Sequence, residues 1–177
     1  MKRIFPVLLI AVIVSYFSSC EKDDICVEGD TPFLVIGFYD AASEEEEDVF
    51  KSVPSLRIRA IDNDSIYSKT TAPVFTDRST VSDSVLVPLR IDASTTTFEF
   101  IINSDDNDED IETGTIDSLT FSYSVDSEYI SRACGFIPNF NALDTTRQVY
   151  TTDWIKRISI VNENVERSNT IHVKIFH

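Results

Sequence analysis

The chain has 177 residues, 42% of them hydrophobic, and it carries a net charge of −15 at neutral pH. This length and hydrophobic content are enough for one folded domain with a sizeable core, and they argue against a disordered chain. The acidic balance repels phosphate backbones and anionic headgroups, so we expect no nucleic-acid partner and no electrostatic attraction of the protein to a membrane.

Residues 1–19 have the pattern of a secretory signal peptide. Lys2 and Arg3 precede an apolar run over residues 4–17, and two serines precede Cys20. This run is shorter than the roughly 20 apolar residues that a bilayer-spanning helix needs. Small residues before a cysteine are typical of bacterial lipoprotein signals. We therefore expect cleavage before Cys20 and lipidation of Cys20, with an uncleaved membrane anchor as the alternative.

The residues that follow Cys20 indicate a more specific location. The segment Cys20-Glu21-Lys22-Asp23-Asp24 resembles the export signal of surface lipoproteins in the Bacteroidota, in which a lysine and two acidic residues follow the lipidated cysteine. The resemblance implies that Lys22, Asp23 and Asp24 direct the protein to the cell surface, in the outer leaflet of the outer membrane. The alternative is a solvated tether on a periplasm-facing protein.

Removal of the signal peptide leaves a more acidic protein that the lipid alone would hold at the membrane. Residues 1–19 contain two basic residues and no acidic one, so their loss changes the net charge from −15 to −17. An anionic surface repels such a protein. The membrane is therefore expected as a partner through the N-terminal lipid.

The cysteine count predicts one disulfide. If Cys20 carries lipid, Cys26 and Cys134 remain as a pair in an oxidising compartment. A bond between them would close a loop of about 108 residues and stabilise the fold by about 4–5 kcal/mol in the chain-entropy model. Two unpaired buried thiols are the alternative. Zinc binding by this pair is not expected, since neither cysteine has a second Cys or a His at ligand spacing.

After residue 31 the sequence alternates apolar and polar residues over short runs, as half-buried β-strands do. Such runs occur at residues 55–60, 85–91, 119–125 and 171–175. Two further segments, 33–39 and 98–102, are largely apolar on both faces and are predicted to be central strands. Pro88 lies in the run 85–91, so that strand is expected at a sheet edge or at a bulge.

Eight or nine such strands without intervening helices predict an all-β fold. The expected architecture is a single antiparallel β-sandwich, Ig-like or jelly-roll-like, with a small β-barrel as the alternative. No internal repeat or second domain is visible. The chain thus divides into a signal peptide at 1–19, a lipidated cysteine and tether at 20–31, and a β-sandwich domain at 32–177.

The sequence offers little for catalysis. It contains two histidines. His172 alternates with apolar neighbours and is expected beside Lys174 on the polar face of a strand, whereas His177 is expected to be frayed. A Ser-His hydrolase is therefore poorly supported. Trp154 is expected in the core. We expect no catalytic residue.

Asp106, Asp108 and Asp110 stand at alternate positions, which resembles the start of a calcium-binding loop. However, Ile111 occupies the position at which an EF-hand requires glycine, and the flanking segments have strand patterns, so the loop is not an EF-hand. We expect no metal or other cofactor. A calcium ion held by these three aspartates is the alternative.

Several segments together resemble a family of small Bacteroidota lipoproteins of unknown function. They are the signal ending at Cys20, Asp24-Ile25-Cys26, the strand that follows Thr31-Pro32, Phe121-Ser122-Tyr123 and Ser131-Arg132-Ala133-Cys134-Gly135-Phe136. The resemblance implies an envelope location but no known activity. We expect a non-catalytic binding or structural module on the outer membrane, with an envelope protein or glycan as a candidate partner. The alternative is an envelope hydrolase that uses paired acidic residues on glycans.

Overall fold

The computed structural model describes residues 26, 31–43, 48–61, 77–148, 153–167 and 170–177. These residues form nine strands and no helix, and therefore no helix that could span a membrane. The strands are β1 (Phe33–Tyr39), β2 (Val53–Ala60), β3 (Ser79–Val81), β4 (Ser84–Pro88), β5 (Thr95–Ile102), β6 (Thr115–Ser131), β7 (Gly135–Gln148), β8 (Arg157–Ile160) and β9 (Val173–Phe176).

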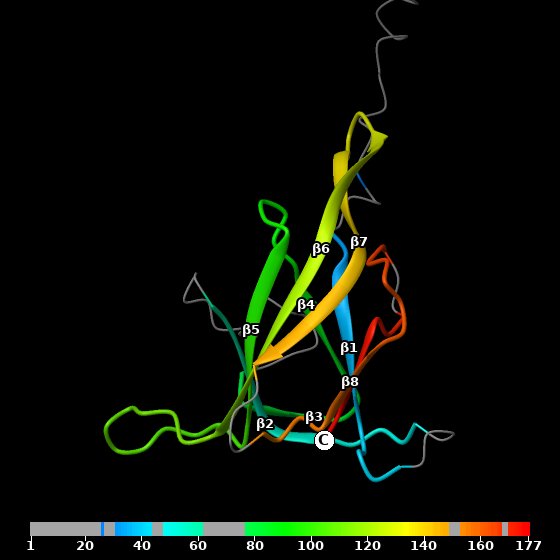
Figure 1. The fold of residues 1–177 in the computed structure, drawn as a ribbon. Coiled ribbons are helices and arrows are strands. Elements are labelled where there is room, and N and C mark those ends of the chain that lie inside the picture. Colours follow the sequence, from blue (N-terminus) through cyan, green and yellow to red (C-terminus); the bar gives the residue numbers. More distant parts are fainter. Residues whose placement is uncertain (1–25, 27–30, 44–47, 62–76, 149–152, 168–169) are drawn as a thin grey trace, which may run out of the picture.

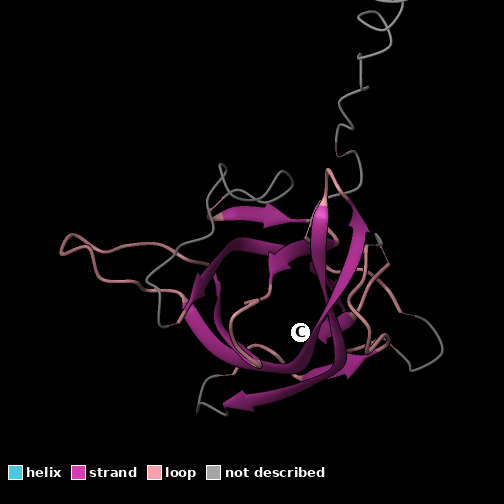
Figure 2. Ribbon diagram, turned by 90° about the horizontal axis from the view of Figure 1, so that it is seen from above, coloured by secondary structure: helices cyan, strands magenta, loops and turns pink. Residues whose placement is uncertain are grey.

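The strands of the described residues form two sheets that enclose one hydrophobic core (Figures 1 and 2). One sheet has the order β4-β1-β9-β8 and the other has the order β3-β2-β5-β6-β7. The predicted all-β sandwich is thus confirmed. One pairing departs from the antiparallel arrangement, because β1 and β9 run parallel. Side-chain alternation reports which face of a strand is buried, not the direction of its neighbour.

The two segments predicted as central strands occupy interior positions of the sheets. β1 lies between β4 and β9, and six of its seven residues are buried. β5 lies between β2 and β6, and Phe98 and Phe100 on one of its faces are buried in the core. β4, which ends at Pro88, is an edge strand, as predicted from the missing proline N–H.

β6 and β7 form a hairpin that extends beyond the sandwich (Figure 1). The first half of β6 is rooted in the core through Leu119, Phe121 and Tyr123, whereas residues 126–129 are exposed. Gly135 begins β7 with a φ of 70°, a backbone conformation that glycine adopts without steric cost. The sequence predicted a strand at residues 119–125 but neither β7 nor the hairpin.

The predicted disulfide is present and lies at the turn of this hairpin. Cys134 belongs to the turn between β6 and β7, and its Sγ is bonded to that of Cys26, with 4.9 Å between the two Cα atoms. The predicted lipidation site Cys20 and the predicted export signal Lys22, Asp23 and Asp24 lie outside the described residues.

The expectations for the two histidines were wrong. His172 is fully buried, and its Nδ1 accepts a hydrogen bond from the backbone N–H of Val35. Alternation misplaced it because His172 precedes β9, where both its backbone N–H and its ring form hydrogen bonds with Val35 of β1. His177 is ordered, since its N–H donates to the Tyr39 carbonyl and its ring packs edge-on against Trp154, with centroids 5.4 Å apart.

Candidate functional site

We define the hairpin tip as residues 129–137, the outermost part of the β6–β7 hairpin. Tyr129 pairs with Phe136 across the two strands, and their rings meet edge-to-face with centroids 5.3 Å apart. The two residues are 53% and 69% exposed. Isolated exposed apolar residues are common, but two aromatic rings in contact at the end of a projecting hairpin are a candidate contact surface.

The turn of the hairpin tip is held by two bonds. The N–H of Cys134 donates to the Ser131 hydroxyl at 3.1 Å, and the disulfide fastens Cys134 to Cys26. Arg132 in this turn is exposed. Cys26 is therefore fixed to the end of the hairpin. The sequence identified the cysteine pair but gave no indication that Cys134 stands at this extremity.

A groove of about 430 Å³ runs along the hairpin beside the tip. Its walls are formed by Glu128, Ile130, Ile137, Asn139, Glu166 and Arg167. Within it, the Asn139 side-chain amide donates to the Glu128 carboxylate at 3.2 Å. The groove thus combines apolar and charged groups, but the six lining side chains include no hydroxyl, thiol or imidazole that could act as a nucleophile.

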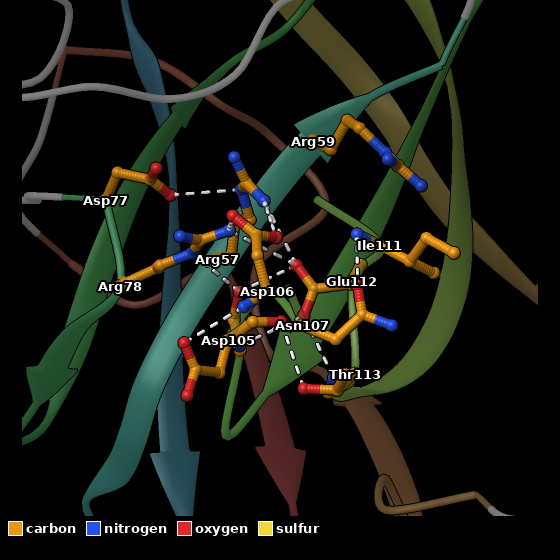
Figure 3. Close-up of polar contacts among 12 residues, drawn as sticks. Arg57, Arg59, Asp77, Arg78, Asp105, Asp106, Asn107, Ile111, Glu112 and Thr113 are labelled. Atoms are coloured by element: carbon orange, nitrogen blue, oxygen red, sulfur yellow. Dashed lines mark hydrogen bonds and ion pairs between the residues drawn. The ribbon is translucent and has the colours of Figure 1, made fainter. Parts of the chain in front are cut away.

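A cluster of arginines and carboxylates lies at the opposite end of β6 from the hairpin tip (Figure 3). The guanidinium of Arg57, on β2, lies 3.1 Å from Glu112 and 3.6 Å from Asp106. It also lies 3.4 Å from Asp77, while Arg78 pairs with Asp106. These contacts attach the connection between β5 and β6 to the face of β2.

Glu112 is the carboxylate of this cluster that accepts the most hydrogen bonds. It accepts hydrogen bonds from the Ser104 hydroxyl at 2.8 Å and from the N–H groups of Gly114 and Asp105 at 2.9 and 3.1 Å. Burial alone raises the pKa of Glu112, but the bonds from Gly114, Ser104 and Arg57 outweigh it, and the net pKa is lowered. An acid that stays ionised in this way is unsuited to donate a proton.

The three aspartates considered for calcium are not brought together as a site. Asp106 directs its carboxylate at Arg57 and Arg78, whereas Asp108 and Asp110 are exposed. Within the part of the chain that the structure describes, no group of three or more His, Cys, Asp or Glu side chains could hold a metal ion. Calcium binding here would have to displace Asp106 from two guanidinium groups.

Sequence reasoning missed Asp117, a fully buried carboxylate on β6. Its Oδ2 accepts hydrogen bonds from the backbone N–H groups of Trp154 and Ile155, at 3.0 and 2.8 Å, and its Oδ1 lies 3.4 Å from Arg147. Arg147 also contacts Asp153 at 2.6 Å. Burial raises the pKa of Asp117, although the bond from Ile155 and the charge of Arg147 oppose the shift.

Asp117 therefore joins β6 to the segment that precedes β8 through its hydrogen bonds. We call this contact the Asp117 clamp. Although Asp117 and Asp153 share one arginine, Asp117 is closed to solvent and both its oxygens have partners. One signal could have found it. Asp117 has the same strand parity as the inward-facing Leu119 and Phe121, so the alternation already placed it in the core.

Partial or complete burial favours the neutral form of both histidines. Burial lowers the pKa of His172, and because Nδ1 accepts a hydrogen bond, the ring proton resides on Nε2. Burial also lowers the pKa of His177, against the hydrogen bond to the Lys51 carbonyl, which raises it. Trp154 is 8% exposed and its indole N–H donates to the Phe100 carbonyl, which confirms its predicted place in the core.

Comparison with known proteins identifies a family but no function. Neither the curated proteins nor the solved structures contained a match to this chain. One family model matches residues 55–177, which include part of β2 and all of β3 to β9, and therefore the whole β6–β7 hairpin. Because this match spans more than half of the chain, the protein belongs to a family of unknown function, DUF6452.

Proposed function

We propose that this protein is a lipid-anchored, non-catalytic binding or structural module of the cell envelope in the Bacteroidota, tethered to the outer membrane through Cys20. The observation that carries the proposal is the Cys26–Cys134 disulfide. Structural disulfides persist mainly in oxidising compartments, as the envelope is. The signal peptide over residues 1–19 and the cysteine that follows it support the same location.

The proposal extends to the cell surface. Lys22, Asp23 and Asp24 follow Cys20 in the order that resembles the surface-export signal. If they are only a solvated tether, the same module faces the periplasm. Its partner would be an envelope protein or a glycan in either case.

The state of the acidic residues supports a non-catalytic role. A glycan hydrolase needs two carboxylates that face the same open space, one of them protonated. Asp106 and Glu112 are instead bound to arginines, and the pKa of Glu112 is lowered. Asp117, whose pKa is raised, is enclosed and bonded to backbone N–H groups.

Metabolic labelling with a fatty-acid analogue in a Bacteroidota host tests the anchor. Wild-type protein should incorporate the label, and Cys20→Ala should not. Cys26→Ala is the matched control, because it removes a nearby cysteine and the disulfide but leaves the lipidation site intact. Equal labelling of wild type and Cys20→Ala would contradict the proposal.

Surface exposure is tested by adding protease to intact cells. Wild-type protein should be degraded, whereas the triple variant Lys22→Ala, Asp23→Ala, Asp24→Ala should be protected while remaining lipidated. If both proteins are degraded equally, these residues form a tether only. If both are protected, the module faces the periplasm.

A further inference from the structure

We infer that the hairpin tip contacts the lipid surface that holds the anchor, with the rings of Tyr129 and Phe136 in the interfacial layer. The inference rests on the proposed lipidation of Cys20. It adds a second membrane contact and a defined orientation of the sandwich, neither of which an N-terminal lipid alone would give.

Chain length restricts how far the tip can lie from the membrane. Cys26 is six positions after Cys20 and is bonded to Cys134 in the turn of the hairpin. An extended chain advances at most about 3.3–3.6 Å per residue, so the disulfide lies within roughly 20 Å of the Cys20 backbone. The disulfide thus keeps the hairpin tip within this distance of the anchor.

The surface that faces the anchor has the composition of a membrane-interface contact. Tyr129 and Phe136 are more than half exposed and pack against each other. Aromatic rings, tyrosine in particular, favour the layer between headgroups and acyl chains. Two exposed rings bind a bilayer weakly by themselves, but a covalent anchor keeps them at high local concentration beside it.

The distribution of charge favours the same orientation. Residues 129–137 contain one charged residue, Arg132, which is exposed. Residues 105–112 contain six acidic residues and lie in the connection at the opposite end of β6, which Figure 1 places far from the tip. An anionic lipid surface repels the acidic end more strongly than the tip.

Glu128, the acidic residue nearest in sequence to the tip on β6, does not oppose this arrangement. Neighbouring residues of a strand point to opposite faces, so its side chain lies on the face away from Tyr129. There it lines the groove and accepts a hydrogen bond from Asn139. The aromatic face of the tip is therefore free of acidic side chains from residues 128–137.

An introduced tryptophan can report the contact. Phe136→Trp in the mature lipidated protein is reconstituted into vesicles of phosphatidylethanolamine and phosphatidylglycerol, with and without brominated acyl chains. We expect the bromolipids to quench most of the emission added by the substitution. The native Trp154 is buried and its indole N–H is hydrogen-bonded to the Phe100 carbonyl, so bromolipids should not change its emission. Phe50→Trp is the matched control, because Phe50 is 51% exposed but neighbours Tyr39 at the far end of β1.

A second form separates this inference from the proposed lipidation. The mature chain carries a polyhistidine tag in place of Cys20 and is held on nickel-chelating lipids in the same vesicles. Quenching of the introduced indole in both forms supports the tip contact. If the lipidated protein co-floats with vesicles but the indole at position 136 is no more quenched than that at position 50, the inference is wrong and the anchor stands. Failure of the natural protein to float contradicts the proposed lipidation instead.

Binding of the untagged, unlipidated mature chain to vesicles measures the affinity that the tip contributes. Phe136→Ser should raise the lipid concentration needed for half-binding roughly five- to tenfold, whereas Phe50→Ser should leave it unchanged. A concentration-dependent blue shift of the introduced indole without lipid would show that a second copy covers the tip, which would overturn the inference.

Discussion

The Nδ1 of His172 accepts a hydrogen bond from the backbone N–H of Val35 at 3.0 Å, across 137 positions of sequence. The N–H of His172 in turn donates to the Val35 carbonyl at 2.9 Å. The imidazole therefore stands in for a backbone acceptor at the point where β9 begins to pair with β1. This contact joins two strands of one sheet through a side chain that the sequence alternation assigns to the surface.

Replacement of His172 by phenylalanine tests this contact. His172→Phe fills the space but leaves the buried Val35 N–H without its acceptor, which should lower the free energy of unfolding by about 1–3 kcal/mol. Urea denaturation measures the difference. His177→Phe is the control, because it retains the packing on Trp154 and loses only an exposed contact to the Lys51 carbonyl. Equal stabilities of His172→Phe and wild type would contradict the assigned role.

Stability should fall as the pH is lowered below 6.5. Burial lowers the pKa of both His172 and His177 from their ordinary value of 6.5. Below that value the unfolded chain binds protons that the folded chain excludes, so the free energy of unfolding decreases with falling pH and is fully retained above it. Urea titrations at a series of pH values measure this slope. It should flatten in the double variant His172→Phe, His177→Phe, and an unchanged slope would assign it to other groups.

The Asp117 clamp predicts a difference between two substitutions. Asp117→Asn keeps an oxygen for the N–H groups of Trp154 and Ile155, whereas Asp117→Ala leaves both unpaired and removes a partner of Arg147. We expect Asp117→Ala to cost about 3–5 kcal/mol of unfolding free energy and Asp117→Asn to cost clearly less. Thermal and urea denaturation would show this order. Asp126→Ala, at an exposed site on the same strand, should be nearly neutral.

Loss of the disulfide should destabilise the domain. The bond closes a separation of 108 residues, so Cys134→Ser should lower the free energy of unfolding by about 4–5 kcal/mol in the chain-entropy model. Cys26→Ser should have the same effect, and the double variant should be no worse than either single variant. Additive losses in the double variant would show that the cysteines act independently.

The arginine cluster should control the order of the connection between β5 and β6. Arg57→Ala removes the contacts to Asp77, Asp106 and Glu112, so amides in residues 105–113 should exchange hydrogen faster. Arg59→Ala is the matched control, two positions along the same strand, because Arg59 pairs with Glu99 at a more exposed site. Equal exchange in the two variants would refute this assignment.

The sequence predicts the strands of this protein better than their arrangement. Alternation located β2, β4 and β6 because each has one face on a common core, and Pro88 marked an edge because it lacks an N–H. The parallel partner of β1 was not predictable, since pairing between strands so far apart depends on how the whole chain folds back.

The candidate site, too, could be predicted only in part from the sequence. Counting cysteines was enough to pair Cys26 with Cys134, because one cysteine was assigned to lipid. Their location at the hairpin tip depends on the lengths of β6 and β7 beyond the core, where exposed residues such as Ser127 leave no periodic pattern. Asp117 was overlooked because it is one of thirty acidic residues, although it has the same strand parity as the inward-facing Leu119 and Phe121.

The parallel pairing of β1 with β9 has a consequence for how the domain folds. Ile36 lies opposite Val173, so the four-stranded sheet closes only after segments 137 positions apart have met. Contacts of such separation require a large loss of chain entropy before they stabilise anything, which makes folding slow, on the order of milliseconds to seconds. Before β9 pairs with β1, the apolar strand β1 has an unpaired edge that another unfolded chain could bind. The protein is therefore most prone to aggregate at this stage of folding.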